Sequence, residues 1–228
     1  MATTLRWLGH NTWLLETAGH KILIDPFLND SPTAPQKAEQ VEADFVLVSH
    51  GHYDHIADAA AILKRTGATV VSNFEICEWL AKQGVQKAES MNHGGAISLP
   101  FGRVKYTPAI HSSVLPDGTN GGNPGGFLLT LGDGKKLYFA CDTALFSDMK
   151  LIGAGGLDLA VVPIGDRYTM GPDDAVEAVK LLAPKKALPC HYGTWPPIAQ
   201  DAKAWAARVK SEAKCEGLAI EPGDTVTL

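Results

Sequence analysis

The amino-acid sequence predicts an α/β fold in which two β-sheets pack face to face with helices on the outside. Both halves of the chain begin with short strand-like runs and then continue as alternating strands and helices, an order that suits such a layered sandwich. Hydrophobic residues make up 45% and charged residues 20%, as in a globular protein with a buried core. A chain of 228 residues is within the range of one domain, so we expect a single domain over residues 1–228.

The first half is expected to open with a meander of three strands separated by Gly- and His-containing turns. A Pro-rich loop follows, and then a continuous apolar run that is typical of a strand buried on both faces. Asn73 is a candidate helix cap, because its side chain accepts a hydrogen bond from the first helical turn. The expected strands are Leu5–Leu8, Thr12–Glu16, Lys21–Ile24, Asp44–Ser49 and Thr69–Ser72, and the expected helices are Ala57–Arg65 and the segment from Asn73 to Lys82.

The second half is strand-dense at first, and Gly132-Asp133-Gly134 predicts a hairpin turn. Pro172 stands at the first turn of a predicted helix with acidic residues directly behind it, as helix N-termini prefer. The expected strands are Ala96–Leu99, Val104–Ala109, Phe127–Leu131, Lys136–Ala140, Leu157–Pro163, Lys186–Pro189, Leu218–Ile220 and Thr225–Thr227, and the expected helices are Pro172–Leu182 and Ile198–Lys214.

Composition excludes several classes of protein. The net charge of −5 argues against a protein that mainly grips nucleic acid, so no nucleic-acid partner is expected. No signal peptide precedes the first strand, and no apolar run reaches the ~18–20 residues that span a bilayer, so we expect a cytoplasmic protein without a membrane partner. The four cysteines form no CxxC pair and are expected to be reduced. A homo-oligomer is plausible, but the sequence does not determine the oligomeric state.

The main chemical signal is the segment His50-Gly51-His52-Tyr53-Asp54-His55, which directly follows the buried strand. Three histidines and one aspartate within six residues are a dense set of metal ligands, because imidazole nitrogen and carboxylate oxygen both suit zinc. On a loop, His50 and His52 would turn to one side and chelate one ion, while Asp54 and His55 would serve a second. The alternative is a solvated polar loop, which one histidine would favour but this cluster does not.

Three further residues occupy the same kind of position. His111, Asp142 and His191 each come just after the carboxyl end of an expected strand, as the main cluster does. Since strand ends on one rim of a sandwich converge, we expect these side chains to reach one site. Each alone would be read as a turn residue.

The ordered ligand set His50-x-His52-x-Asp54-His55, His111, Asp142 and His191 resembles that of the metallo-β-lactamase superfamily over nearly the whole chain. The closer resemblance is to a branch of small bacterial and archaeal metal-dependent hydrolases. That branch is similar to the ascorbate-6-phosphate lactonases and the N-acyl phosphatidylethanolamine-hydrolysing phospholipase D. The motifs that carry it are Trp7-Leu8-Gly9-His10, Ile24-Asp25-Pro26-Phe27, Cys141-Asp142-Thr143, Thr169-Met170-Gly171-Pro172 and His191-Tyr192-Gly193-Thr194-Trp195-Pro196.

The resemblance implies a four-layer αββα sandwich and a site for one or two metals, but no particular substrate. We expect two divalent cations, with zinc first and Mn²⁺, Fe²⁺ or Ni²⁺ as alternatives. The resemblance places one ion on His50, His52 and His111 and the other on Asp54, His55 and His191, with Asp142 bridging them.

The chain departs from these families at informative positions. Cys141 and Cys190 directly precede Asp142 and His191, and the branch usually has Gly in place of Cys141; we interpret both thiols as bystanders rather than oxidation-sensitive groups. The lactamases proper usually differ at the position of His55, which points away from antibiotic hydrolysis. The di-iron oxygen reductases carry Glu at the position of His52, so the histidine favours hydrolysis over redox chemistry.

The ligand set predicts hydrolysis of an ester, lactone, amide or phosphodiester in a small-molecule substrate by a metal-bound hydroxide, because such an ion lowers the pKa of water to roughly 7. Asp54 could also orient the nucleophile. We expect His10 to face the site as a substrate contact or proton donor, with a surface turn as the alternative. Asp25 is a candidate to hold a ligating imidazole, with a plain Asp-Pro turn as the alternative.

Other residues are assigned by their position next to these motifs. Residues that are expected to line the pocket are Asp166, Tyr168, Met170, Tyr192, Thr194 and Trp195, while His20 and His93 are expected to be structural. A nuclease or cyclic-nucleotide phosphodiesterase is the alternative enzyme. A non-catalytic metal-binding protein is the alternative from another class, although a structural zinc needs only four ligands.

Overall fold

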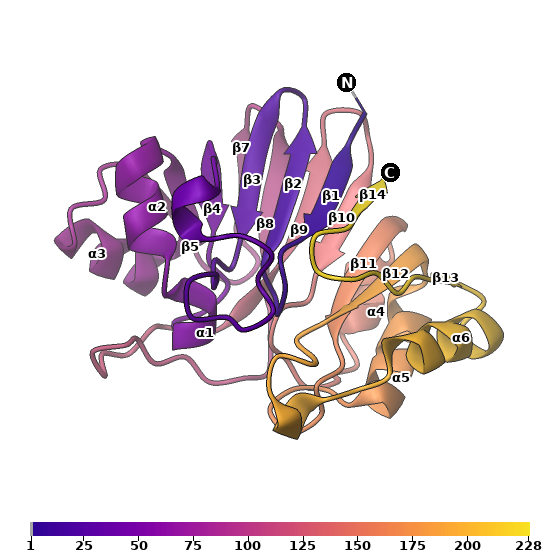
Figure 1. Ribbon diagram of the computed structural model, residues 1–228. Coiled ribbons are helices and arrows are strands. Elements are labelled where there is room, and N and C mark those ends of the chain that lie inside the picture. Colours follow the sequence, from indigo (N-terminus) through magenta and orange to yellow (C-terminus); the bar gives the residue numbers. More distant parts are fainter. Residues whose placement is uncertain (1) are drawn as a thin grey trace.

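Two seven-stranded mixed sheets pack against each other in the computed structural model, which describes residues 2–228 (Figure 1). The first sheet has the strand order β14-β1-β2-β3-β4-β5-β6, and the second has the order β13-β12-β11-β10-β9-β8-β7. The strands of the first sheet are β1 (Thr4–Trp7), β2 (Trp13–Thr17), β3 (His20–Ile24), β4 (Phe45–Leu47), β5 (Thr69–Asn73), β6 (Ala88–Met91) and β14 (Thr225–Thr227). The strands of the second sheet are β7 (Ala96–Leu99), β8 (Gly102–Pro108), β9 (Gly125–Leu131), β10 (Lys136–Phe139), β11 (Leu157–Pro163), β12 (Pro184–Cys190) and β13 (Glu216–Gly217).

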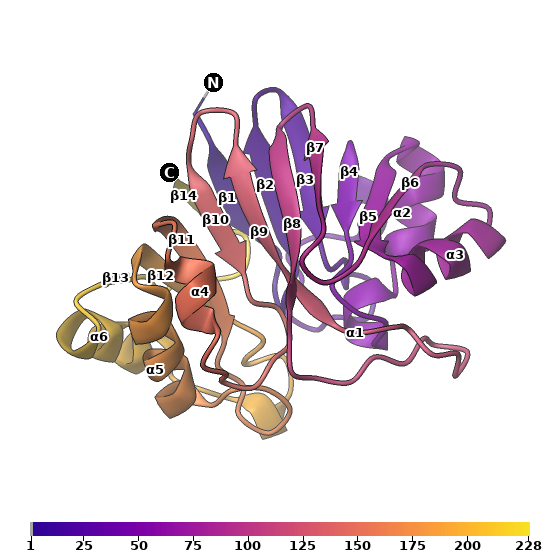
Figure 2. The same ribbon diagram turned by 180° about the vertical axis from the view of Figure 1, so that it is seen from behind.

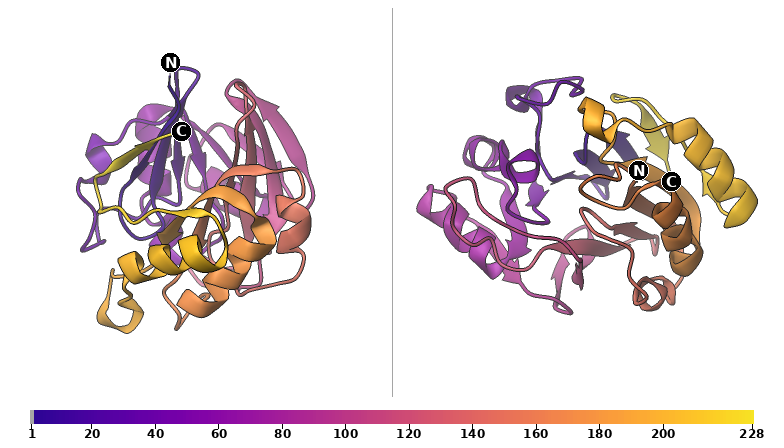
Figure 3. Two further views of the ribbon diagram at one scale, coloured as in Figure 1. Left: turned by 90° about the vertical axis from the view of Figure 1, so that its right-hand side faces the viewer. Right: turned by 90° about the horizontal axis from the view of Figure 1, so that it is seen from below.

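Helices cover the outer face of each sheet (Figures 2 and 3). The helices beside the first sheet are α1 (Tyr53–Ile56), α2 (Ala59–Thr66) and α3 (Phe74–Lys82), and those beside the second are α4 (Met149–Gly153), α5 (Pro172–Leu182) and α6 (Ala202–Glu212). Short 3-10 helices occupy Ala38–Gln40 and Pro196–Ile198. No helix within residues 2–228 has the length and apolar character needed to cross a membrane.

Three hydrophobic clusters separate these layers. Large side chains such as Trp13, Tyr106 and Phe127 fill the space between the two sheets. A second cluster joins the first sheet to α2 and α3, and a third joins the second sheet to α5 and α6. The predicted four-layer αββα sandwich is therefore confirmed.

Parallel strands bring their carboxyl ends to one edge of the sandwich. Strands β3 to β6 run parallel in the first sheet, and β10 to β13 run parallel in the second. The edge where these strands end is the lower edge in Figure 1, where α1 lies. Segments that are distant in sequence meet there because each follows the end of a strand.

Several expected elements differ from the structure. The histidine cluster is not wholly a loop as we expected, since Tyr53–Ile56 forms the single-turn helix α1. The expected strand Leu218–Ile220 is wrong, because the chain pairs with β12 two residues earlier, at Glu216–Gly217. Helix α6 begins at Ala202 rather than Ile198, since the Asp201 side chain caps it by accepting from the Ala204 amide at 2.9 Å.

Strand β6 and helix α4 were also not predicted. Strand β6 has three exposed side chains out of four, so it shows no apolar alternation and is defined only by backbone pairing with β5. Helix α4 spans five residues, too short for a helical period to stand out in the sequence.

Candidate metal centre

The residues around the candidate centre share an unusual backbone conformation. Among the described residues, eight that are not glycine have a positive φ, and five of these follow strands at the lower edge. Left-handed φ values cost free energy for residues with a Cβ and tend to cluster at functional sites. The five are His10 (φ 50°), Asp25 (φ 45°), Cys141 (φ 53°), Asp166 (φ 73°) and His191 (φ 54°).

One half of the centre, which we call the three-histidine group, consists of His50, His52 and His111. One ring nitrogen from each lies within 4.8 Å of the others. His50 Nε2 is 2.9 Å from His52 Nδ1, and His111 Nε2 is 3.2 Å from the same atom. His50 is fully buried, while His52 and His111 are half-buried. These three imidazoles come from the end of β4 and the end of β8 and form a set suited to one ion.

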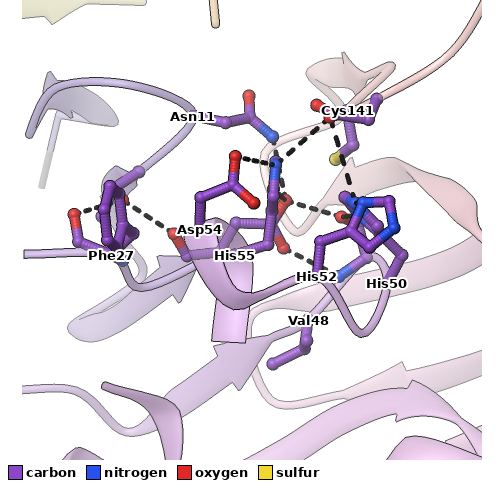
Figure 4. Close-up of polar contacts among 12 residues, drawn as sticks. Asn11, Phe27, Val48, His50, His52, Asp54, His55 and Cys141 are labelled. Carbon is purple, nitrogen blue, oxygen red and sulfur yellow. Dashed lines mark hydrogen bonds and ion pairs between the residues drawn. The ribbon is translucent and has the colours of Figure 1, made fainter. Parts of the chain in front are cut away.

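The other half, which we call the mixed group, consists of His10, Asp54, His55 and His191. Their candidate ligand atoms also lie within 4.8 Å of one another. Asp54 Oδ2 lies 3.8 Å from His55 Nε2 and 3.7 Å from His191 Nε2. Helix α1 presents Asp54 and His55 in adjacent positions of its one turn. Figure 4 shows the side chains of His50, His52, Asp54 and His55 gathered at the end of β4.

Asp142 lies between the two groups. Its Oδ2 is 3.9 Å from His50 Nε2 and 3.5 Å from His111 Nε2 in the three-histidine group. The same oxygen is 3.3 Å from His55 Nε2 and 3.0 Å from His191 Nε2 in the mixed group. One carboxylate oxygen therefore faces imidazoles of both groups.

Buried polar atoms without partners test whether these residues fit metal ions. His55 Nε2, His191 Nε2 and Asp142 Oδ1 are buried and make no hydrogen bond, although they converge. Leaving such atoms unpaired costs roughly 1–3 kcal/mol each, so native proteins rarely tolerate several together without a ligand. The residues present fit divalent cations, which would satisfy these atoms with the nitrogen and oxygen ligands that such ions prefer.

Asp25 orients the imidazoles of His55 and His50, the first directly and the second through Ser49. Its Oδ2 accepts from His55 Nδ1 at 2.8 Å, from Ser49 Oγ at 2.6 Å and from Asn11 Nδ2 at 2.9 Å. Because the Ser49 hydroxyl donates to Asp25, it accepts from His50 Nδ1 at 2.9 Å. In their neutral forms, His50 and His55 are therefore inferred to carry the proton on Nδ1 and to present Nε2 to a metal.

His10 reaches the centre through Asp54. Its ring is fully buried, so it is placed behind Asp54 rather than at the surface where a substrate would arrive. Burial, together with the neighbouring His191, lowers the pKa of His10 to about 3, so the ring is neutral. The ionised Asp54 only accepts, so His10 Nε2 donates to Asp54 Oδ2 at 3.0 Å and His10 Nδ1 accepts from Thr194 Oγ1 at 2.7 Å.

The two groups differ in charge. Burial lowers the pKa of His50, His52 and His111, so these rings are neutral. Burial also disfavours charge on the other rings, but Asp142 and Asp54 outweigh it and raise the pKa of His191 to about 9 and that of His55 well above its usual value. His191 and His55 in turn hold the pKa of the buried Asp142 well below its usual range.

A cavity of about 300 Å³ opens onto both groups. Five of the seven predicted metal ligands line it, together with Ser112, Tyr168 and Trp195. Of the other residues expected at the pocket, Met170 lies in the core beneath the second sheet and Tyr192 stacks on Trp7 at 5.2 Å. Thr194 is buried against His10, and Asp166 is exposed outside the cavity, so these four are not lining residues.

The remaining assignments concern side chains away from the cavity. His20 lies 3.9 Å from Asp44 in its hairpin turn, and His93 bonds the Pro124 carbonyl at 2.8 Å. The Cys141 thiol is buried between the sheets, and burial raises its pKa well above the usual value. The thiols of Cys141 and Cys190 are therefore protonated and do not line the cavity.

Sequence reasoning missed the residues that hold the ligands in place. Asn11 and Ser49 stand next to predicted site residues, and only their hydrogen bonds to Asp25 reveal a role. Gly165 lies so near His191 that a Cβ there would be 2.3 Å from the His191 carbonyl oxygen. A polar residue or a glycine at the end of a strand was the only available signal, and it is too common to single these residues out.

Comparisons with known proteins agree with this geometry. Residues 20–192 match the family described as "Beta-lactamase superfamily domain". The chain is 50% identical over 224 residues to a UPF0173 metal-dependent hydrolase of Thermus thermophilus, covering 98% of both proteins. It is 46% identical over 230 residues to one of Heliobacterium modesticaldum, covering 97% of this chain and 96% of that protein. The structure of Igni18, a metallo hydrolase from Ignicoccus hospitalis, superposes with a TM-score of 0.91 at 36% identity, covering 100% of this chain and 99% of the other.

Proposed function

The chain belongs to the beta-lactamase superfamily and is a metal-dependent hydrolase, and we propose that it uses two divalent cations to cleave an ester, lactone, amide or phosphodiester in a small molecule. The observation that carries this proposal is the position of Asp142 Oδ2, which lies 3.0–3.9 Å from imidazole nitrogens of both groups. The ions would be held by His50, His52 and His111, and by Asp54, His55 and His191, with Asp142 between them.

Divalent cations polarise the bond to be cleaved and lower the pKa of water to roughly 7, which makes hydroxide available at neutral pH. The chain's own residues place the substrate and the protons. Asp54 lines the cavity and is ionised, since His55 and His10 outweigh burial and lower its pKa. It therefore accepts a hydrogen bond from an attacking water and orients it toward the substrate.

His10 and Thr194 act on Asp54 rather than on the substrate. The chain of hydrogen bonds from Thr194 through His10 fixes one oxygen of Asp54 at 3.0 Å from His10 Nε2. Because His10 is neutral and donates with Nε2, it leaves the negative charge on Asp54. The role we propose for His10 is thus to position a catalytic carboxylate.

The seven donors support an enzyme over a non-catalytic metal site. A structural zinc is closed by four protein ligands and has no need of a cavity beside it. Here five of the donors line a cavity that opens to solvent, so a substrate can approach the ions.

Replacing His52 by Ala tests the proposal. The variant His52→Ala is expected to lose one metal equivalent per chain and to lose hydrolysis of whichever substrate the wild type cleaves. Metal content is measured by elemental mass spectrometry, after reconstitution with zinc, manganese, iron or nickel in turn. His20→Ala is the matched control, because His20 is a histidine remote from the cavity. Unchanged metal content and activity in His52→Ala would contradict the proposal.

A further inference from the structure

The ligands of the three-histidine group come from two segments that are distant in sequence. His50 and His52 lie in the turn after β4, whereas His111 follows β8 and is 59 residues away from His52. A site for an ion needs its ligand atoms held to within about 0.5 Å, so the two segments need a contact that fixes one against the other. Residues 112–124, which we call the connecting segment, run from His111 past α1 to β9 (Figure 2) and lie against the turn.

A side chain of the connecting segment hydrogen-bonds to the turn itself. The Gly51 amide, between His50 and His52, donates to the Ser113 hydroxyl oxygen at 3.0 Å. Gly51 is buried and Ser113 is half-buried. A buried amide needs an acceptor, because leaving it unpaired costs as much as a lost hydrogen bond. One serine hydroxyl, two residues after His111, therefore joins the segments that supply all three imidazoles.

The backbones around this hydrogen bond pack so closely that they leave little room for side chains. A Cβ at Gly51 would lie 3.1 Å from the side chain of Leu115 and 3.2 Å from the carbonyl carbon of Val114. A Cβ at Gly121 would lie 2.4 Å from the Ser113 hydroxyl oxygen and 3.4 Å from the Cα atom of Gly51. The Ser113 hydroxyl is therefore enclosed between the turn and the connecting segment.

The turn is also anchored at its start. The Ser49 carbonyl accepts from the Tyr106 hydroxyl at 2.6 Å and from the Gly125 amide at 3.1 Å. Asn73 Nδ2 donates to the Gly121 carbonyl at 2.7 Å and so holds the connecting segment in place. The turn is thus fixed by β8 and β9 before its first histidine and by the connecting segment after it.

From these contacts we infer that Ser113 is a positioning residue for the three-histidine group. By accepting from the Gly51 amide, its hydroxyl keeps His50 and His52 at the place where they share an ion with His111. Ser113 does not line the cavity, so its effect is on the affinity for the metal and not on the bond that is cleaved. The inference rests on the metal part of the proposed function and needs no choice of substrate.

Replacing Ser113 tests the inference in the metal-free and in the zinc-loaded protein. In metal-free Ser113→Ala, hydrogen exchange of the Gly51 amide, measured by NMR, should be faster than in the wild type, because the acceptor is lost. When zinc binding is measured in competition with a chelator, the affinity for one ion should fall about tenfold, while the affinity for the other should stay unchanged. Ser113→Thr retains the hydroxyl and should behave as the wild type. Ser98→Ala, at an exposed serine of β7, is the control.

A second variant disturbs the same contact from the other side. Gly121→Ala should push the Ser113 hydroxyl away from the Gly51 amide and weaken binding of the same ion. Gly132→Ala is its control, because a Cβ there would have its closest contact, with the Phe101 carbonyl oxygen, at 3.9 Å.

The His52→Ala variant identifies which ion is affected. It lacks the ion of the three-histidine group, so adding Ser113→Ala to it should leave the affinity for the remaining ion unchanged. Unchanged zinc affinities in Ser113→Ala, equal weakening of both ions, or the same loss in Ser113→Thr as in Ser113→Ala would overturn the inference. The expected zinc affinities in a protein that cleaves no ester, lactone, amide or phosphodiester would uphold the role of Ser113 and count against the proposed function.

Discussion

The two halves of the metal centre are built from similar side chains but held in different ways. In the three-histidine group, His52 and His111 are half-buried and neutral, and the His52 ring lies within hydrogen-bond distance of the exposed Ser112 hydroxyl, at 3.4 Å. In the mixed group, His55 and His191 are buried, carry raised pKa values and face two ionised carboxylates. Two of the three neutral rings of the first group are therefore accessible, while the histidines of the second group must release protons when an ion binds.

Replacing Asp142 should remove this difference and have the largest effect. Its Oδ2 faces imidazoles of both groups, so Asp142→Asn should weaken metal binding in both and lower kcat/KM by more than about 100-fold, beyond the 10–100-fold range typical of residues that only support a ligand. Metal content per chain and steady-state kinetics measure the two effects. Asp133→Asn, at a hairpin turn, is the control. Loss of only one equivalent of metal would show that Asp142 serves one group alone.

Asp25 and Ser49 allow each group to be disturbed separately. Asp25→Asn keeps the shape and tolerates the positive φ, but it loses the charge that holds His55, so metal affinity of the mixed group should fall 10–100-fold. Ser49→Ala removes the link to His50 and one hydrogen bond to Asp25, while the bond between His55 and Asp25 remains, so it should weaken the three-histidine group more than the mixed group. Titration of the metal-free variants with zinc measures both affinities. Equal effects of the two variants on both ions would contradict the separation of the groups.

The charge difference also predicts the pH dependence of the metal-free protein. The pKa of His10 falls from the usual value of roughly 6.5 to about 3 on folding, so between these values the unfolded chain binds a proton that the folded chain refuses. Stability is therefore lost as the pH falls through this window, by up to about 1.4 kcal/mol per pH unit for each such group. The pKa of His191 is instead raised to about 9, so its stabilising contribution is fully present below roughly pH 6.5 and is lost as the pH rises from there to about 9.

Urea unfolding of the chelator-treated protein across this pH range measures the loss of stability at acid pH and at alkaline pH. The urea concentration at the midpoint of unfolding should be highest near neutral pH and fall on either side. His10→Asn, which removes the buried ring, should reduce the loss of stability at acid pH without abolishing it, because His50, His52 and His111 also have lowered pKa values, and should leave the loss at alkaline pH unchanged. A midpoint that rises steadily on acidification would contradict the assignment of a neutral His10.

Most of the predicted ligands could be found from the sequence because they come shortly after a strand, and strand ends are a local signal. His50, His111, Asp142 and His191 all reach the centre in this way. The backbone at Cys141 is left-handed, a conformation that glycine adopts without strain and that fits the glycine expected there from the resemblance.

What the sequence could not provide depends on which strands are neighbours and how each turn is oriented. The convergence of Asn11, Ser49 and His55 on Asp25 requires β2, β3 and β4 to lie side by side, which no single segment encodes. The helical turn α1 could not be predicted either, because four residues are too few to show a helical pattern in the sequence. The part of the cavity wall formed by Tyr168 and Trp195 also depends on two distant loops that meet only in the folded chain.

The pairing of β14 with β1 has a consequence for how the protein is made. Thr4, Leu5 and Arg6 at one end of the first sheet take their partners from Thr225–Thr227, after α6 has already formed part of the other half (Figure 1). While the ribosome is still adding the residues of α6, β1 has one edge without a partner. An unpaired edge strand is a template for pairing with another chain. Pairing with β14 covers this edge of β1, and the edge that remains at that side of the sheet belongs to a strand of only three residues.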